Sequence, residues 1–164
     1  MNWHTAFLLQ ARSDNEIRNL LNRNRVPYAH ELHYLQMTWE KLAKGVLMRE
    51  GETRPSSMLS HRAFVRCLHH IKADPRVRCF LRYKDASSFT GFINSLLPLA
   101  EQIERLAPSL AGTTRPNPEY PWKPLGGGAV EVPIMYDFPE FEPYVSQMEK
   151  LDMLLNKLLR FYIS

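Results

Sequence analysis

Residues 30–48 read HELHYLQMTWEKLAKGVLM, and this segment carries the most regular apolar pattern in the chain. Its large apolar residues recur at alternating spacings of three and four, which places them on one face of an α-helix. These residues are Leu32, Leu35, Trp39, Leu42 and Val46. The pattern predicts a helix over residues 28–49 that buries this seam against other helices.

The segment before it also has a helical period. Over residues 2–22, alternating spacings of four and three link Trp3, Phe7, Gln10, Asp14, Ile17 and Leu21. Residues 13–16 fit a capping box that would restart the helix at Asp14, but we favour one continuous helix. Residues 22–27 then form a connector.

A third helix is predicted to end near Ala73, after loop and N-cap residues at 54–57. Its buried side holds Phe64, Leu68 and Ile71. Asp74 and Pro75 are typical of a helix N-cap and of the first helical position. A short fourth helix is therefore predicted over residues 75–84.

Ser87 or Ser88 suits the N-cap of a fifth helix, which the apolar spacing continues to Leu110. Pro98 lies within this pattern and lacks a backbone donor, so it predicts either a kink or the start of a separate helix. The buried stripe contains Phe89, Phe92 or Ile93, Leu96, Ala100, Ile103, Ala107 and Leu110.

A long excursion without helical period follows over residues 112–138. Eight of the 12 prolines lie between Pro108 and Pro143, and three successive glycines occupy residues 126–128. Several large apolar side chains in the excursion would be costly to leave in water, so we expect this loop to pack across the bundle. They are Tyr120, Trp122, Met135, Tyr136 and Phe138.

The last part of the excursion alternates Val130, Val132, Ile134 and Tyr136, which allows one short strand. Pro133 would confine such a strand to a sheet edge. A last helix is predicted over residues 139–162. Together the elements predict an all-α, up-and-down bundle of five or six helices with one long structured loop, in a single domain over residues 1–164.

Composition excludes several other classes of protein. The chain has 164 residues, of which 45% are hydrophobic, so it can bury one sizeable core and is neither disordered nor fibrous. No apolar run reaches the roughly 20 residues of a membrane span, and the N-terminal segment does not resemble a secretory signal. The two cysteines form neither a zinc nor a disulfide pattern. We therefore expect a cytoplasmic protein that does not bind a membrane.

The net charge of +4 is unevenly distributed. Residues 1–100 carry 15 Lys and Arg against 8 Asp and Glu, whereas residues 101–164 carry 6 against 9. The largest local excess lies at residues 62–84, where Asp74 opposes Arg62, Arg66, Lys72, Arg76, Arg78, Arg82 and Lys84. Such an excess favours RNA as a partner, although a basic helix face is also typical of an ordinary solvated surface.

The most regular helix also carries a polar signature that resembles the Q-x3-E-K-x2-K pattern of the HEPN superfamily, a group of compact helical bundles. Its members here are Gln36, Glu40, Lys41 and Lys44. Ala11 and Asp14 resemble the A-x2-D pattern of that family, and residues 60–68 are similar to its T/S-H-x-L segment. The resemblance covers residues 5–110 and leaves the proline-rich excursion as an elaboration.

Two interpretations of the signature residues stay open. Glu40 and Lys44 suit an i,i+4 ion pair on a solvated helix face, which contributes about 0.2 to 0.5 kcal/mol. Alternatively, the four residues line a cleft or an interface between protomers. They are Gln36, Glu40, Lys41 and Lys44.

The resemblance implies one of two activities, because HEPN proteins are of two kinds. One kind is a metal-independent endoribonuclease with an Arg-x(4 to 6)-His motif. In that motif the histidine exchanges protons and the arginine stabilises charge on the phosphorus oxygens. The other kind lacks the motif and serves as a binding or regulatory partner, often beside a nucleotidyltransferase.

Four Arg–His pairs have the spacing of this motif. Three of them span a connector or a proline: Arg23–His30, Arg25–His30 and Arg54–His61. Arg62 and His69 are instead predicted to share the third helix, two turns apart and on the side opposite the core, with Arg66 between them. Because His70 flanks this line, the candidate catalytic residues are Arg62, Arg66, His69 and His70.

Other kinds of site are disfavoured. His30 and His33 are spaced i,i+3, but no Asp, Glu or Cys completes a metal site with them. The glycines at 126–128 lack the Lys and the following helix of a phosphate-binding loop. We expect neither a metal nor a cofactor.

Three functions follow from the residues and the resemblance. The first is an RNA- or nucleotide-binding HEPN-like module in a toxin–antitoxin, defence or regulatory assembly, without the usual ribonuclease motif. The second is a metal-independent endoribonuclease that uses an Arg/His pair, and the third is a pure protein-interaction subunit. The resemblance also implies a homodimer and, as a candidate partner, a nucleotidyltransferase-like or defence protein.

Overall fold

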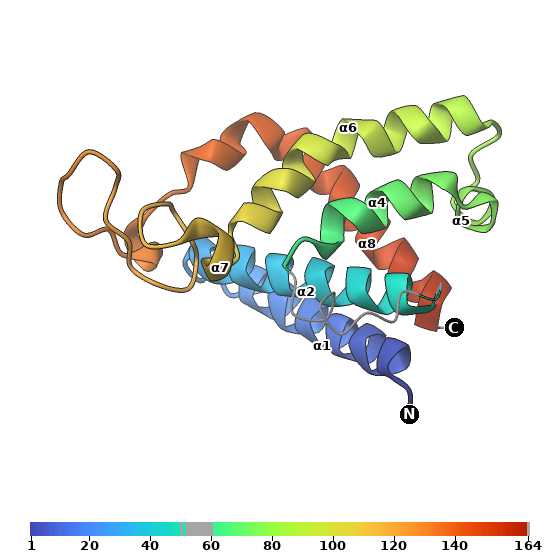
Figure 1. The fold of residues 1–164 in the computed structure, drawn as a ribbon, viewed down its shortest axis with the longest axis horizontal. Coiled ribbons are helices and arrows are strands. Elements are labelled where there is room, and N and C mark those ends of the chain that lie inside the picture. The colour runs from blue at the N-terminus through green and yellow to red at the C-terminus, as the bar shows by residue number, and fades with distance from the viewer. Residues whose placement is uncertain (50, 52–60, 164) are drawn as a thin grey trace.

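The computed structural model describes residues 1–49, 51 and 61–163, which form an all-α bundle as predicted (Figure 1). Within this part of the chain, five helices are longer than ten residues: α1 (Trp3–Arg23), α2 (Tyr28–Arg49), α4 (Ala63–Ala73), α6 (Ala86–Arg105) and α8 (Val145–Ile163). Two others are short: α5 (Pro75–Phe80) and α7 (Pro108–Ala111). Among the described helices, none combines the length and the apolarity that crossing a membrane requires.

Helices α1 and α2 form an antiparallel pair along the lower side of the molecule in Figure 1. The bounds of α2 match the predicted helix, and all five of its seam residues are buried. Gly45 allows the two helices to approach closely, because a Cβ at this position would lie 2.8 Å from Cδ2 of Leu8. Helix α1 is continuous past Asp14, as we favoured.

The buried face of α1 differs from the stripe that the sequence predicted. Trp3 and Ile17 are exposed, and the buried residues are Leu8, Ala11, Asp14, Asn15 and Arg18. Polar side chains can be buried here because they meet partners on other helices. The guanidinium of Arg18, for example, donates two hydrogen bonds to the carboxylate of Asp152 in α8, at 2.6 and 3.0 Å.

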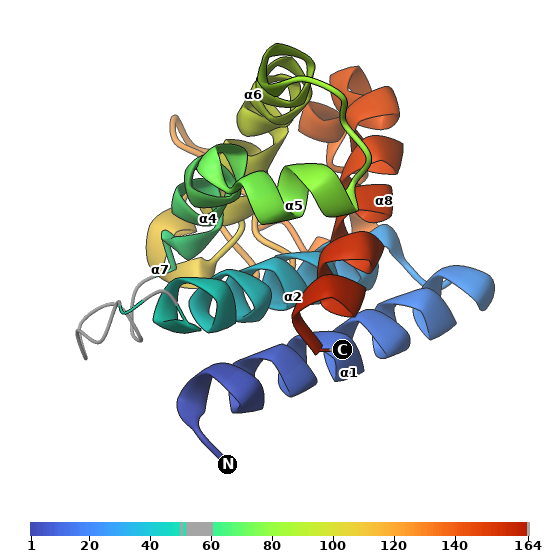
Figure 2. The same ribbon diagram turned by 90° about the vertical axis from the view of Figure 1, so that its right-hand side faces the viewer.

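Helices α4 and α6 cover the other side of α2, and α8 crosses the bundle (Figures 1 and 2). The apolar side of α4 is buried as predicted, and its Phe64 ring stacks on Trp39 with a centroid distance of 4.2 Å. Helices α2 and α4 both run from left to right in Figure 1, whereas α1 and α6 run from right to left. The predicted N-cap segment of α4, residues 54–57, lies outside the described residues.

Helix α6 passes through Pro98 as one helix, so no separate helix begins there. Its N-cap is Asp85 and not a serine, because the Asp85 carboxylate accepts a hydrogen bond from the backbone N–H of Ser88 at 2.7 Å. The predicted continuation to Leu110 is wrong. Ala107 precedes Pro108 and has an extended backbone (φ −60°, ψ 129°), which the ring of a following proline favours over the helical conformation.

Helix α5 is shorter than predicted, because it ends at Phe80 and not near residue 84. Arg82 follows with a left-handed φ of 63°, which a helix cannot continue. Figure 2 shows α5 leading from the end of α4 toward α8.

The excursion over residues 112–138 packs on the bundle through part of the predicted apolar set, because Tyr120 and Met135 are exposed. Trp122 and Phe138 are buried, and the Tyr136 ring meets each of them edge-on at 5.0 Å. The strand allowed at residues 130–136 does not form: one isolated bridge joins Trp122 to Glu131, and Pro133–Met135 form the 3-10 turn η1.

The last predicted helix is also irregular at its start. Pro139–Tyr144 form the 3-10 helix η2, and α8 begins only at Val145. Pro143 lies near the end of η2 and has no backbone donor for a regular α-helical bond. Apolar side chains from α1, α2, α4, α5, α6, η2 and α8 meet in one hydrophobic cluster.

Candidate functional site

The signature residues of α2 lie inside the protein, where Glu40 is the centre of a polar cluster. Its carboxylate accepts a hydrogen bond from Nε2 of Gln36 at 2.8 Å and one from Nζ of Lys44 at 2.6 Å. A third comes from Nδ1 of His61, at 2.7 Å. The interpretation of Glu40 and Lys44 as a pair on a solvated face is therefore wrong, because both are buried; Lys44 lies over the ring of Phe7 in α1.

The surroundings of Glu40 keep its carboxyl group ionised. Burial raises the pKa of Glu40, but the hydrogen bonds and positive charges of Lys44 and His61 outweigh this effect, and the pKa lies below its ordinary value. A buried carboxylate needs such partners, because an isolated charge in a protein interior is strongly disfavoured. The ionised carboxylate of Glu40 is thus stabilised by Lys44 and His61, and Gln36 adds a hydrogen bond from a neutral amide.

Lys41, the remaining signature residue, pairs with α1. Its Nζ lies 2.5 Å from Oδ2 of Asp14, and Oδ1 of Asp14 accepts a hydrogen bond from Nε2 of Gln10 at 3.0 Å. Asp14 belongs to the segment that resembles the A-x2-D pattern. Two of the three segments that carry the resemblance are therefore in direct contact.

Sequence reasoning did not place His61 in this cluster. The sequence places His61 in the segment similar to T/S-H-x-L and in a pair with Arg54, which lies outside the described residues. The bond to Glu40 engages Nδ1, so Nε2 remains as the second nitrogen of a side chain that is 36% exposed. A carboxylate–histidine pair of this geometry can exchange protons through Nε2. No helical period connects Glu40 with a residue 21 positions later in another segment, so residue spacing alone could not have predicted the pair.

The basic line on α4 has the orientation that the spacing predicted. Arg62, Arg66 and His69 are all exposed, whereas the apolar side of α4 faces the core. Arg62, however, is the N-cap residue of α4, with non-helical angles (φ −107°, ψ 34°). Arg62 and His69 therefore do not share a helix, because α4 begins one residue after Arg62.

Glu104 of α6 supplies the acceptor that the start of α4 needs. Its Oε1 accepts a hydrogen bond from the backbone N–H of Val65 at 2.9 Å. Burial raises the pKa of Glu104, although backbone hydrogen bonds from Val65 and Phe64 and the charge of Arg62 act in the opposite direction. This contact holds the N-terminus of α4, and with it Arg62, beside α6.

The two candidate catalytic histidines of α4 have different surroundings. His69 is exposed, and its Nδ1 lies 3.4 Å from Nζ of Lys72. His70 is half-buried, and its buried Nε2 has no hydrogen-bond partner among the residues that the structure describes. Successive residues of a helix point about 100° apart, so the structure does not bring these two rings together in one site.

The remaining basic residues at 72–84 divide by their contacts. Nζ of Lys72 donates to Oδ1 of Asn94 at 3.1 Å, and the guanidinium of Arg76 bonds to the carboxylate of Asp74 at 2.8 Å. The other three belong to α5 or to its connection with α6: Arg78, Arg82 and Lys84. Because α5 leads away toward α8, this second group does not continue the line of α4 (Figure 2).

Two aromatic side chains lie near these charges in the chain. Phe80 is 42% exposed, with its ring 5.1 Å from that of Phe161. Tyr83 packs against Phe89 and Phe92, so its ring is held by the bundle. Among the described residues, no group of three or more His, Cys, Asp or Glu side chains is placed to hold a metal ion.

No family model, no curated protein and no solved structure matches this chain. The resemblance to HEPN proteins therefore stays a prediction that rests on the residues quoted for it. The geometry above is independent of that resemblance, because it follows from the contacts of this chain alone.

Proposed function

We propose that this chain is an RNA-binding module and that it binds the RNA backbone through the α4 face, defined as Arg62, Arg66, His69 and Lys72. The observation that supports this proposal is the exposed line of Arg62, Arg66 and His69, opposite the buried side of α4. Arg and Lys side chains on one surface are the groups that contact phosphates without regard to sequence.

Binding to a fluorescently labelled single-stranded RNA, followed by anisotropy, tests the α4 face. The test variant carries Arg66→Gln and Lys72→Gln. The matched control carries Arg12→Gln and Arg160→Gln, which remove the same charge from exposed positions on α1 and α8. At about 0.1 M salt we expect only the test variant to lose affinity, and its salt slope should fall by about 0.7 for each lost phosphate contact. Absence of RNA binding by the unaltered chain would instead favour a pure protein-interaction subunit.

The resemblance to HEPN proteins supports a place in a toxin–antitoxin, defence or regulatory assembly. It also supports a homodimer, with a nucleotidyltransferase-like or defence protein as the candidate partner. Light scattering of the purified chain tests the homodimer directly, and a mass of one chain at micromolar concentration contradicts it. Co-purification with the products of neighbouring genes tests the candidate partner.

RNA cleavage is a second candidate function, and the Glu40–His61 pair favours it. In this reaction His61 would take the proton of a ribose 2′-hydroxyl while the 2′-oxygen attacks the adjacent phosphorus. The bond to the 5′-oxygen breaks, that oxygen takes up a proton, and a 2′,3′-cyclic phosphate remains. Arg62 follows His61 in the chain and would stabilise charge on the phosphorus oxygens. This proposal replaces His69 and His70 with His61 as the proton-transfer group.

Incubation of total RNA with the purified chain in excess chelator separates the two functions. Cleavage that is lost in His61→Ala but kept in His69→Ala and His70→Ala supports the second function. Loss in His69→Ala alone would instead return the catalytic role to α4. Intact RNA in the presence of measurable binding leaves the binding module as the function.

A further inference from the structure

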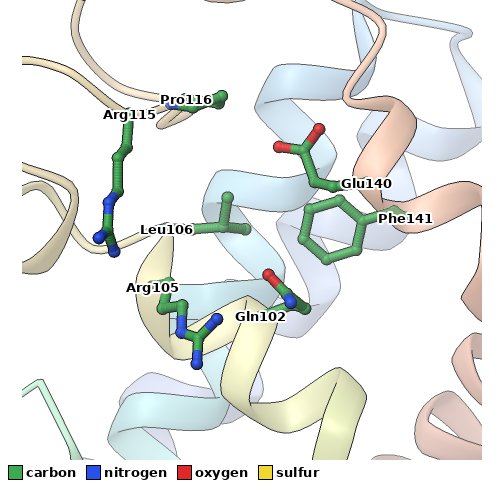
Figure 3. Close-up of a pocket in the computed structure, with 7 residues that line it drawn as sticks. All are labelled: Gln102, Arg105, Leu106, Arg115, Pro116, Glu140 and Phe141. Carbon is green, nitrogen blue, oxygen red and sulfur yellow. The ribbon is translucent and has the colours of Figure 1, made fainter. Parts of the chain in front are cut away.

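A hollow of about 420 Å³ lies where α6, the excursion and η2 meet, and none of the functions above uses it (Figure 3). Its apolar lining comes from Leu106, Pro116 and Phe141. Ligand pockets in proteins typically measure about 300 to 1,000 Å³ and combine such an apolar surface with a few polar groups. The hollow therefore has the size and the lining of a small-molecule site.

The polar groups of the hollow are arranged by charge. Figure 3 shows the guanidinium groups of Arg105 and Arg115 on its lower left and the carboxylate of Glu140, beside the Phe141 ring, across from them. The amide of Gln102 lies between the two sides. A ligand in this space would meet positive charge at one end and a hydrogen-bond acceptor at the other.

Both arginines retain donors for a ligand. Arg115 has no hydrogen bond or ion pair with any residue in the described part of the chain. Arg105 lies 3.7 Å from Glu101, but both side chains are 54% exposed, and an exposed pair at this distance is weak. The same two arginines also border a second hollow of about 290 Å³, which extends toward Arg62. Glu101 and Glu104 also line this second hollow and offset part of its positive charge, whereas in the first hollow the two arginines face one carboxylate, that of Glu140.

We propose that this site binds a small molecule in which a phosphate is attached to a ring bearing hydroxyl or amine groups. Two guanidinium groups on one side suit the double charge of a phosphate better than the single charge of a carboxylate. The ring packs against Phe141 and Leu106, and its hydroxyl or amine groups donate to Glu140. Nucleoside monophosphates and sugar phosphates share this chemistry. None of the four residues of the α4 face lines this hollow, so this inference does not depend on RNA binding.

Calorimetric titration of the full chain tests the proposal and distinguishes the two sources. One arm uses AMP and CMP, and the other uses ribose 5-phosphate and glucose 6-phosphate. Adenosine, glucose and inorganic phosphate are the comparison probes. We expect at least one phosphorylated ring to bind about tenfold or more tightly than its unphosphorylated parent and than inorganic phosphate, because a charge-assisted hydrogen bond is worth at least that factor.

Two test variants and two control variants place the binding in this hollow. Arg115→Gln should weaken binding of the phosphorylated ring by about tenfold, whereas Arg12→Gln on α1 should leave it unchanged. Glu140→Gln should weaken binding of the ring compound but not that of inorganic phosphate. Arg66→Gln, which tests the α4 face, should have no effect, so failure of RNA binding and failure of this site are distinguishable.

The proposal is overturned if no phosphorylated ring binds more tightly than inorganic phosphate. It is equally overturned if Arg115→Gln binds the ring compound with unchanged affinity. Arg115 is exposed, so its substitution should leave the thermal midpoint of unfolding unchanged, which a circular dichroism melt checks.

Discussion

The carboxylate of Glu104, on α6, accepts a hydrogen bond at 2.9 Å from the backbone N–H of Val65, in the first turn of α4. The first N–H groups of a helix have no partner within the helix. Arg62, the N-cap residue of α4, makes no capping hydrogen bond with its side chain. A residue 39 positions later in the chain therefore caps α4 and sets where the α4 face begins.

Substitution of Glu104 should destabilise the protein, by an amount that depends on whether the new side chain can still accept a hydrogen bond. Glu104→Ala is expected to lower the free energy of unfolding by about 1 kcal/mol, the usual loss for a capping side chain. Glu104→Gln keeps an oxygen acceptor and should lose less. Urea unfolding at neutral pH measures both values, and a Glu104→Ala variant as stable as the unaltered chain would show that the contact contributes nothing.

The pH dependence gives a second measurement on Glu104. Its pKa is raised in the folded protein, chiefly by burial, so the folded state holds this proton more tightly than the unfolded state does. Protonated Glu104 thus favours the fold, and this contribution is lost as the pH rises through the folded pKa. The free energy of unfolding of the unaltered chain, minus that of Glu104→Gln, should therefore fall between about pH 4 and pH 7. A constant difference across this range would contradict the raised pKa.

Glu40 should show the opposite dependence on pH. Burial acts to raise its pKa, but the bonds from Lys44 and His61 lower it overall, so the folded state favours the ionised form. Its contribution to stability is complete above the unfolded carboxyl pKa, about 4.3, and is lost as the pH falls through the lower folded value. Urea unfolding of the unaltered chain and of Glu40→Gln at a series of acidic pH values measures this loss. The two free energies of unfolding should converge as the pH falls.

Substitution of one member of the Glu40–Lys44 pair should cost more than substitution of both. Glu40→Ala leaves Lys44 buried without its carboxylate partner, and loss of one partner of a buried pair costs about 3 to 5 kcal/mol. The double variant Glu40→Gln, Lys44→Met removes both charges and should recover much of that loss. If the double variant is as unstable as the sum of its two single variants, the two residues do not act as an energetic pair.

Two glycines in helix interiors should respond oppositely to alanine. At Gly45 the new Cβ would lie 2.8 Å from the buried side chain of Leu8, so Gly45→Ala should destabilise the fold by about 1 to 3 kcal/mol through overpacking. A Cβ at Gly91 would meet no described atom within 4 Å beyond the backbone of its own helix and its chain neighbours, so Gly91→Ala should stabilise α6 by about 0.5 to 1 kcal/mol. Thermal unfolding measures both, and stabilisation by both changes would mean that α1 and α2 are less closely packed.

The two cysteines should differ in reactivity toward a thiol reagent. Burial raises the pKa of the Cys67 thiol to about 12, whereas Cys79 is exposed on α5. The reagent should modify one thiol in the native protein and a second only in denaturant, because the thiolate is the reactive form. Cys79→Ser should abolish the native reaction. Rapid modification of both thiols in the native state would contradict the burial of α4 against the core.

Helix positions could be predicted where apolar spacing was regular and local. The bounds of α2 and the outward direction of Arg66 and His69 follow from the angle of about 100° between neighbouring residues, which needs no knowledge of the rest of the chain. The same rule misassigned α1, where Arg18 is buried because Asp152 lies opposite it. A spacing rule that counts only apolar residues cannot recognise a polar residue whose partner is on another helix.

For the candidate site too, the sequence predicted the features that lie within one helix but not the contacts between segments. The cationic line of α4 and the acid–base order of Glu40 and Lys44 are visible in the chain, because residues three and four apart share a helix face. That Glu40 meets His61, that Glu104 caps α4, and that Arg105 and Arg115 border one hollow depended on how separate segments pack. Each of these contacts joins residues that no short-range period relates, and packing of the whole core sets their distance and their burial.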